Sequence, residues 1–282
     1  MAIIYKEEWM TKLQERLLDP TLWKELCNVE YTDTKVIHNP YRTASSSTSG
    51  TRGAAYNYNA IAMGDESVDI DQFKICPELI DRADLAQSGY LTQMNIAEDQ
   101  GKTLNKDIET AMFAEHAQFT DFDNASIGGS AGNITVSTSN IDDIIGGIKR
   151  EIVEAEGTGL MESNGVAIVW RPADFEKLEK YAKAQGYNTA DDVLKNGIKK
   201  GFVYGGVEHY QSNRLASGHL FAGVKKLLHL GICKGTYGEA IFVDEPATAD
   251  GSVSGVGVTS RVDYKFKAWL KTKVLLFDIL VA

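Results

Sequence analysis

Residues 77–119 read PELIDRADLAQSGYLTQMNIAEDQGKTLNKDIETAMFAEHAQF and hold the pattern around which the rest of the chain is organised. From Gly89 onward, small or apolar residues recur every three or four positions, at Leu91, Met94, Ala97, Gly101, Leu104, Ile108, Ala111 and Met112. This spacing predicts one amphipathic helix of about thirty residues, roughly 45 Å long. Such a length favours a supporting strut, and the alternative is a long helix in an ordinary bundle.

The opposite face of this predicted helix is charged or carries amides. Glu98 and Lys102 stand four residues apart in the favourable order. Asp99, Asn105, Lys106 and Glu109 are predicted to keep this face in water.

The composition is that of an ordinary folded protein, with 282 residues, 43% hydrophobic and 24% charged. No apolar run is long enough to cross a bilayer, and the start lacks a signal-peptide pattern, so we expect synthesis in the cytosol. Cys27, Cys76 and Cys233 match neither a zinc nor a redox spacing and are predicted to be buried hydrophobes. The net charge of −10 argues against a dedicated nucleic-acid binder.

Two segments before the long helix differ from a compact core. Residues 1–30 have helical character, with Trp9 and Leu13 on one side before Asp19-Pro20 interrupts. Residues 31–75 are strand-like and enclose ASSSTSGTRG at 44–53, which offers almost nothing to bury. We expect a long hairpin with a polar tip, used in an intermolecular contact, and the alternative is a mobile surface loop.

The remaining chain predicts an α/β unit followed by strands. A helix is expected from Asn140, with a buried stripe at Ile141, Ile144, Ile145, Ile148, Ile152 and Val153. Residues 166–170, VAIVW, predict a buried strand, and Pro172 opens the next helix. From residue 201 the pattern returns to strands, and the polar loop 244–255 is expected to protrude.

No motif of catalysis, nucleotide binding or metal binding is present. The chain lacks a P-loop, a GxGxxG turn, an HExxH pair and a GxSxG elbow, and a calcium-like start at Asp121 lacks the turn glycine. His116 is predicted to be a partly exposed helix residue. An enzyme would need a site built from dispersed residues, for instance Arg171, Asp174 and His209.

The order of these parts resembles the major capsid proteins of tailed phages, the Hong Kong 97 fold. VDIDQFKICPELIDRADLAQSGY (68–90), leading into NIAEDQGKTLNKDIE (95–109), is similar to that family's passage from flap into spine helix. GVEHYQSNRLAS (206–217) is similar to its strand returning from the inserted domain. The resemblance implies an α+β capsid fold with a long spine helix, an extended E-loop hairpin, a peripheral domain and an inserted α/β axial domain.

The same resemblance implies a division of the chain. Residues 1–30 would be the N-terminal arm, 31–75 the E-loop, 76–138 and 236–282 the peripheral domain, and 139–235 the axial domain. Subunit contacts would then involve the arm, the E-loop, the charged helix face and the peripheral tip: Trp9, Leu13, Ser46, Arg52, Tyr56, Tyr58, Glu98, Lys102, Asp244 and Glu245.

The implied function is structural, not enzymatic. Hexamers and pentamers of the chain would close into an icosahedral shell around phage double-stranded DNA, in the host cytoplasm and then in the virion. We expect separate scaffolding and portal proteins, only weak contacts with DNA, and no membrane, small-molecule substrate, cofactor or metal. Some relatives cross-link subunits by a Lys–Asn bond, but Lys35 and Lys74 only flank the flap, so we expect non-covalent stabilisation. The alternatives are an encapsulin-type compartment and the dispersed-site enzyme.

Overall fold

The computed structural model describes residues 21–43, 47, 49–53, 55, 60–82, 92–185, 202–237, 240–248, 251–252 and 254–282, without the side chains of 92–95, 247–248 and 251–252. The helices are α1 (Trp23–Leu26), α3 (Thr92–Ala114), α4 (Ile141–Glu154), α5 (Thr158–Asn164) and α6 (Pro172–Ala184), with 3₁₀ helices η1 (Glu115–Gln118), η2 (Asn124–Ile127) and η3 (Lys273–Leu275). The strands are β1 (Cys27–Thr32), β2 (Val36–Arg42), β3 (Met63–Asp69), β4 (Gln72–Asp81), β5 (Thr120–Phe122), β6 (Val166–Trp170), β7 (Phe202–Tyr204), β8 (Val207–Gln211), β9 (His219–Val224), β10 (Leu228–Cys233), β11 (Ala240–Asp244), β12 (Ala247–Thr248), β13 (Gly251–Ser252), β14 (Gly255–Ala268) and β15 (Leu276–Leu280).

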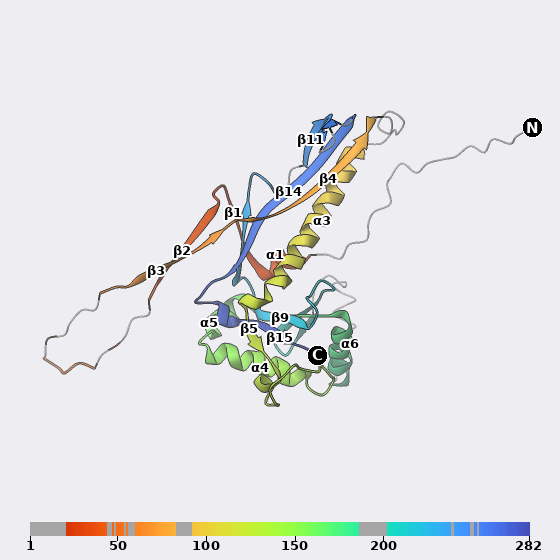
Figure 1. Cartoon of the computed structure of the whole chain (residues 1–282). Coiled ribbons are helices and arrows are strands. Elements are labelled where there is room, and N and C mark those ends of the chain that lie inside the picture. Colours follow the sequence, from red (N-terminus) through yellow and green to blue (C-terminus); the bar gives the residue numbers. More distant parts are fainter. Residues whose placement is uncertain are drawn as a thin grey trace, which may run out of the picture.

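Two sheets organise the subunit. In the first, strands follow the order β1-β10-β14-β11, and β4 also pairs with the long strand β14. The second has the order β5-β15-β9-β6-β8-β7. Figure 1 shows α3 lying along β14 and β4, while α4, α5 and α6 gather around the second sheet. No helix among the described residues is long and apolar enough to cross a membrane.

The predicted long helix is confirmed from Thr92 onward. It runs for 23 residues to Ala114 and continues as the 3₁₀ helix η1. Its apolar stripe at Leu104, Ile108 and Met112 is buried, as the periodicity requires of a helix that packs on its own sheet. Glu109 was predicted on the solvent face but is buried, and this correction leads to the joint described below.

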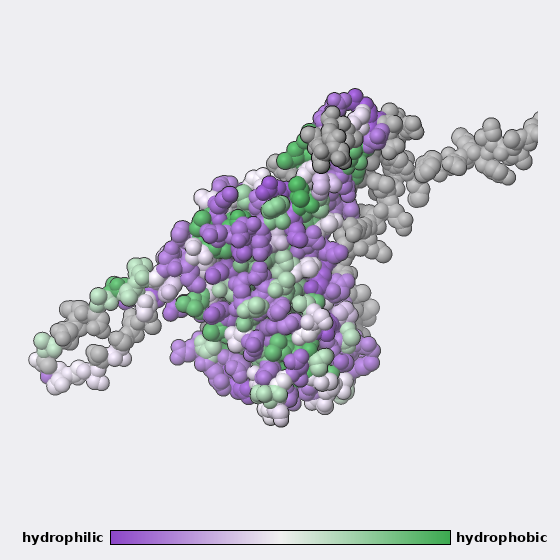
Figure 2. Space-filling view, in the orientation of Figure 1, coloured by the Kyte–Doolittle hydropathy of each residue, from purple (hydrophilic) through white to green (hydrophobic). Residues whose placement is uncertain are grey.

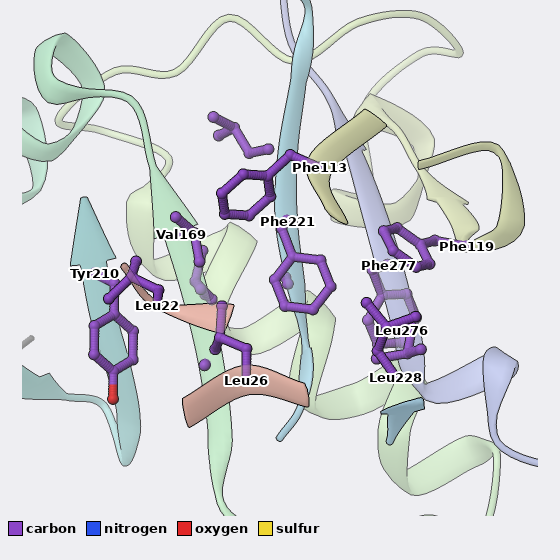
Figure 3. Packing of buried hydrophobic residues seen from close by; sticks show 14 of the residues in the cluster. Leu22, Leu26, Phe113, Phe119, Val169, Tyr210, Phe221, Leu228, Leu276 and Phe277 are labelled. Carbon is purple, nitrogen blue, oxygen red and sulfur yellow. The ribbon is translucent and has the colours of Figure 1, made fainter. Parts of the chain in front are cut away.

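One continuous core joins the spine helix to both sheets. Phe221 of β9 receives the ring edges of Phe113 and Phe119, with centroid separations of 6.3 and 5.4 Å. Leu22 and Leu26 bring the N-terminal segment into the same cluster (Figure 3). Because these side chains come from distant segments, the core fixes the positions of the helix, the sheets and residues 22–26 together.

The hairpin β2–β3 is set apart from this core. Its strands pair antiparallel from Val36↔Asp69 to Arg42↔Met63, and Figure 1 shows it projecting away from the body. Its own buried residues are Ile37, Val68 and Ile70, with Trp269 of the body packed against them. The extended segment predicted from composition is therefore a hairpin with a minimal core at its base.

One local expectation differs from the structure. Helix α4 buries Ile152 but leaves Val153 51% exposed, because adjacent residues on a helix point about 100° apart. In the sheets, strands β5 and β15 belong to the second sheet and β10 to the first. The pairing partners are far apart in sequence, and strand pattern alone does not reveal them.

The contrast on α4 gives a direct stability test. Ile152→Ala should lower the free energy of unfolding by about 2–5 kcal/mol, because it leaves a cavity in a fully buried position. Val153→Ala, the adjacent control, should change it by less than about 0.5 kcal/mol. Urea denaturation of unassembled subunits measures both. Equal losses at the two positions would contradict the orientation of α4.

Candidate functional site

The most unusual polar arrangement is a buried ion pair between the C-terminal half of the spine helix and the segment after β8. The Glu109 carboxylate lies 3.1 Å from Nη1 of Arg214, and both side chains are buried. The Leu22 backbone N–H donates to Oε2 at 2.6 Å, and the Ser212 hydroxyl donates to Oε1 at 3.0 Å. We call these four residues the Glu109 joint.

The Glu109 joint connects three segments through one carboxylate. Burial raises the pKa of Glu109, while the donors from Leu22, Arg214 and Ser212 oppose that rise. A buried charge without such partners would cost several kcal/mol, so the donors must stay in place for the subunit to remain folded. Ser212 and Arg214 belong to the QSNRLAS segment singled out in the sequence, whose position is thereby fixed against the spine helix.

A second polar residue of α3, Gln100, also faces inward and is satisfied by hydrogen bonds. Gln100 of α3 donates to the Val258 carbonyl at 3.0 Å and accepts from the Ser260 hydroxyl at 2.8 Å. Both partners lie on β14. The spine helix is therefore held on its sheet by specific hydrogen bonds as well as by its apolar stripe.

The base of the projecting hairpin is attached to the body at one corner. The Leu270 N–H donates to the Glu66 carboxylate at 2.9 Å, and the Trp269 ring lies 5.2 Å from the His229 ring. A polar-lined hollow of about 330 Å³ lies at this corner, between Glu66 and Lys267, and a second hollow of about 550 Å³ with a mixed lining lies between Lys35 and Arg261. Neither has the apolar enclosure expected of a small-molecule site.

Apolar side chains are exposed where a monomer would bury them. On the hairpin, Ile61 is 67% and Met63 is 71% exposed, and on β11 Ile241, Phe242 and Val243 are exposed in a row. Figure 2 shows apolar surface over the hairpin and at the end of the molecule that carries β11. Contiguous exposed apolar surface of this kind marks an interaction site.

The predicted interface residues do not form one site. Glu98 and Lys102 are exposed one turn apart on α3, and Arg52 is exposed elsewhere, between β2 and β3. Asp244 and Glu245 are exposed at the end of β11, where both pair with Arg82 at 3.1 and 3.3 Å. The other five, Trp9, Leu13, Ser46, Tyr56 and Tyr58, lie outside the described residues.

The alternative enzyme function would need a catalytic group built from Arg171, Asp174 and His209, and these residues do not form one. His209 is buried, accepting at Nδ1 from the Trp170 indole N–H at 3.0 Å and donating from Nε2 to the Tyr204 carbonyl at 3.1 Å. Burial lowers the pKa of His209 to about 4. Asp174 accepts from Lys177 at 2.8 Å, and Arg171 is the N-cap residue of α6. His209 therefore has no lone pair free to act as a base.

His116 occupies a more constrained position than its sequence predicted. It lies half-buried in η1, and its ring stacks on the His219 ring with centroids 3.7 Å apart. Asp278 of β15 faces both rings. Sequence reasoning missed this group because its three members come from distant segments and share no motif.

Comparison with known proteins identifies the fold. No family model and no curated protein matches the sequence. A solved structure from Mycobacterium phage Che8 matches with a TM-score of 0.69 at 16% identity, over 97% of this chain and 96% of that one. The capsid of Ralstonia phage GP4 matches with a TM-score of 0.69 at 9% identity, over 98% and 95% of the two chains.

A virus-like particle from Pyrococcus furiosus also matches, with a TM-score of 0.55 at 11% identity over 92% of each chain. These full-length matches confirm the predicted α+β fold of the Hong Kong 97 type, the fold of tailed-phage capsid proteins. At these identities the likeness concerns the fold alone.

The Glu109 joint predicts strong coupling between its charges. Arg214→Met and Glu109→Gln should each cost about 3–5 kcal/mol of unfolding free energy, because each leaves a buried group without its partner. The double variant should lose much less than the sum. Urea denaturation of unassembled subunits measures the unfolding free energies of the parent, the two single variants and the double variant, which together form a double-mutant cycle.

The exposed pair Arg82 and Asp244 serves as the control for this cycle, since removing either should cost less than about 1 kcal/mol. Additive losses at Glu109 and Arg214, or losses as small as those of the control, would contradict the joint.

His209 predicts a pH-dependent stability. Its pKa in the folded protein is about 4, below the ordinary 6.5, so between these values the unfolded chain binds a proton that the folded chain does not. This contribution is complete above pH 6.5 and is lost as the pH falls toward 4, on the order of 3 kcal/mol. His209→Gln keeps a donor and an acceptor without titrating, so its unfolding free energy should fall less over that range. Identical pH profiles for the two proteins would exclude this role.

Proposed function

We propose that this chain is the major capsid subunit of a tailed phage and that many copies assemble into a closed icosahedral shell. The full-length likeness to phage capsids carries this proposal. The structure supports it physically, because the subunit has a complete core in its body and a hairpin that lacks one.

The hairpin is the element that needs a neighbour. Its three buried residues lie near the end where Trp269 packs, and Ile61 and Met63 lie beyond them in water. Burying each of these two side chains against another subunit would contribute about 1.5–3 kcal/mol. The hairpin would therefore gain its order and its stability from contacts between copies.

We propose the following roles for the segments. Residues 1–30 act as an N-terminal arm, 31–75 as the E-loop, 76–138 and 236–282 as the peripheral domain, and 139–235 as the axial domain. Axial domains meet in hexamers and pentamers. Separate scaffolding and portal proteins take part in assembly, which occurs in the host cytoplasm before the shell becomes part of the virion.

The cargo of the proposed shell is double-stranded DNA. The net charge of −10 opposes tight binding of phosphate, so the lining would make weak contacts and packing would depend on a motor. The fold is that of structural proteins, and we propose that the chain has no enzymatic activity.

A second function keeps the fold and changes the contents. The likeness to a virus-like particle from Pyrococcus furiosus is consistent with this alternative, in which the shell would be a protein compartment that encloses an enzyme. Analysis of purified particles separates the two functions: nucleic acid inside supports the capsid, and a co-purifying enzyme supports the compartment.

The exposed hairpin residues give the test of assembly. The double variant Ile61→Ser/Met63→Ser should remain folded by circular dichroism, since neither side chain is buried in the subunit. It should form far fewer particles in sedimentation and negative-stain microscopy, because the proposed neighbour loses about 3–6 kcal/mol of contact at each hairpin.

Val153→Ser is the matched control, an equally conservative change of an exposed apolar residue on α4. It should assemble like the parent protein. Particle yields of the double variant equal to those of the control would show that the hairpin does not bind a neighbour.

A further inference from the structure

Three side chains meet where the spine helix ends against the second sheet. His116 belongs to η1, His219 begins β9 and Asp278 lies in the middle of β15. The Nδ1 atoms of His219 and His116 lie 2.7 and 3.4 Å from the same carboxylate oxygen, Oδ2 of Asp278. Among the described residues, this is the one group of three whose potential metal-binding atoms lie within 4.8 Å of one another.

The Asp278 carboxylate is buried, and only one of its two oxygens contacts the histidines. Asp278 is 3% exposed, and its second oxygen, Oδ1, has no hydrogen-bond partner. Asp121 stands beside it in the register of β5 and β15 and adds a second negative charge. A cation held at Oδ2 of Asp278 would lie beside both carboxylates and offset their charge, so the site is electrostatically suited to one.

The distances fit a metal ion with small adjustments. At bond lengths near 2.1 Å, the ligand atoms of a tetrahedral ion lie about 3.3–3.4 Å apart. The His116–Asp278 separation of 3.4 Å already has this value, and the His219–Asp278 separation must open by about 0.6 Å. The His116 and His219 rings are stacked with an interplanar angle of 23°, and an imidazole binds a metal in its own plane, so at least one ring must also turn out of the stack. Both histidines are half-buried, which gives the rings room to turn and leaves a position open toward solvent.

We propose that His116, His219 and Asp278 bind a divalent transition-metal ion, with Zn²⁺ as the first candidate. Two imidazole nitrogens and one carboxylate oxygen are ligands that Zn²⁺ accepts, and this donor set discriminates against Ca²⁺ and Mg²⁺, which prefer oxygen. The ion would connect the end of the spine helix to two neighbouring strands of the second sheet. It would thus strengthen the junction at which the helix passes into that sheet.

The test uses the full chain and the metal alone. Protein treated with a chelator and desalted should take up about one Zn²⁺ per chain, measured by inductively coupled plasma mass spectrometry. Zn²⁺ should raise its melting temperature and the chelator should reverse the rise, since a ligand of the folded state stabilises it by mass action. Co²⁺ in place of Zn²⁺ should give visible absorption bands of nitrogen and oxygen coordination.

Variants assign the site. Asp278→Asn and His219→Gln should weaken Zn²⁺ binding at least about tenfold, the factor that even a residue behind the ligands can cost. His116→Gln should do the same at a half-buried position where folding is less at risk. The matched control is His38→Gln, because His38 and Asp65 form an exposed pair with the same 2.7 Å separation outside any group of three among the described residues.

The outcomes are distinct. Uptake of Zn²⁺ that is lost in the three variants and kept in His38→Gln supports the site. Absence of uptake and of a melting shift in the parent protein overturns it, whatever the variants do. A thiolate charge-transfer band with Co²⁺, or equal loss of binding in His38→Gln, also overturns it, because the metal would then bind elsewhere.

Discussion

A single buried carboxylate constrains the body of this subunit. Glu109 lies in the C-terminal half of the spine helix, on the face that meets the core, and its charge is balanced by groups from two distant parts of the chain. Residues near Leu22 must return to the helix, and the segment after β8 must present Ser212 and Arg214 to it. A purely apolar contact would tolerate sliding, whereas a buried carboxylate with three partners allows one arrangement.

The distribution of burial explains how such a body can act as a building block. Both sheets and the spine helix share one core, so the body needs no partner to fold. Among its described residues, the hairpin buries Ile37, Val68 and Ile70 and carries exposed apolar side chains beyond them. Contacts within the subunit therefore stabilise the body, and the hairpin is left to make contacts between subunits.

Much of this fold could be predicted from the sequence because apolar periodicity reports directly on burial. The stripe at Leu104, Ile108 and Met112 and the strand VAIVW are buried as expected. The order of the parts was enough to indicate the capsid fold, although no family model matches the chain.

The errors have a common physical origin. Glu109 was placed on the solvent face because residue type was taken as a guide to burial, and only the presence of Arg214 and Ser212 makes its burial favourable. Val153 is predicted to be buried in the apolar stripe of α4, but it points about 100° away from Ile152 and is exposed. His116 is a partly exposed helical residue as predicted, but its contacts were missed, because its partners His219 and Asp278 come close only through the pairing of β9 with β15. Contacts between distant segments decide such sites, and a single sequence does not display them.

The central claim is that many copies of this chain form a shell in which each hairpin is completed by its neighbour. Cryo-electron microscopy of the expressed protein tests it most directly. The account predicts closed particles in which β2 and β3 lie across an adjacent subunit and Ile61 and Met63 are buried there. A protein that stays monomeric in every condition, or particles whose hairpins contact only their own subunit, would contradict it.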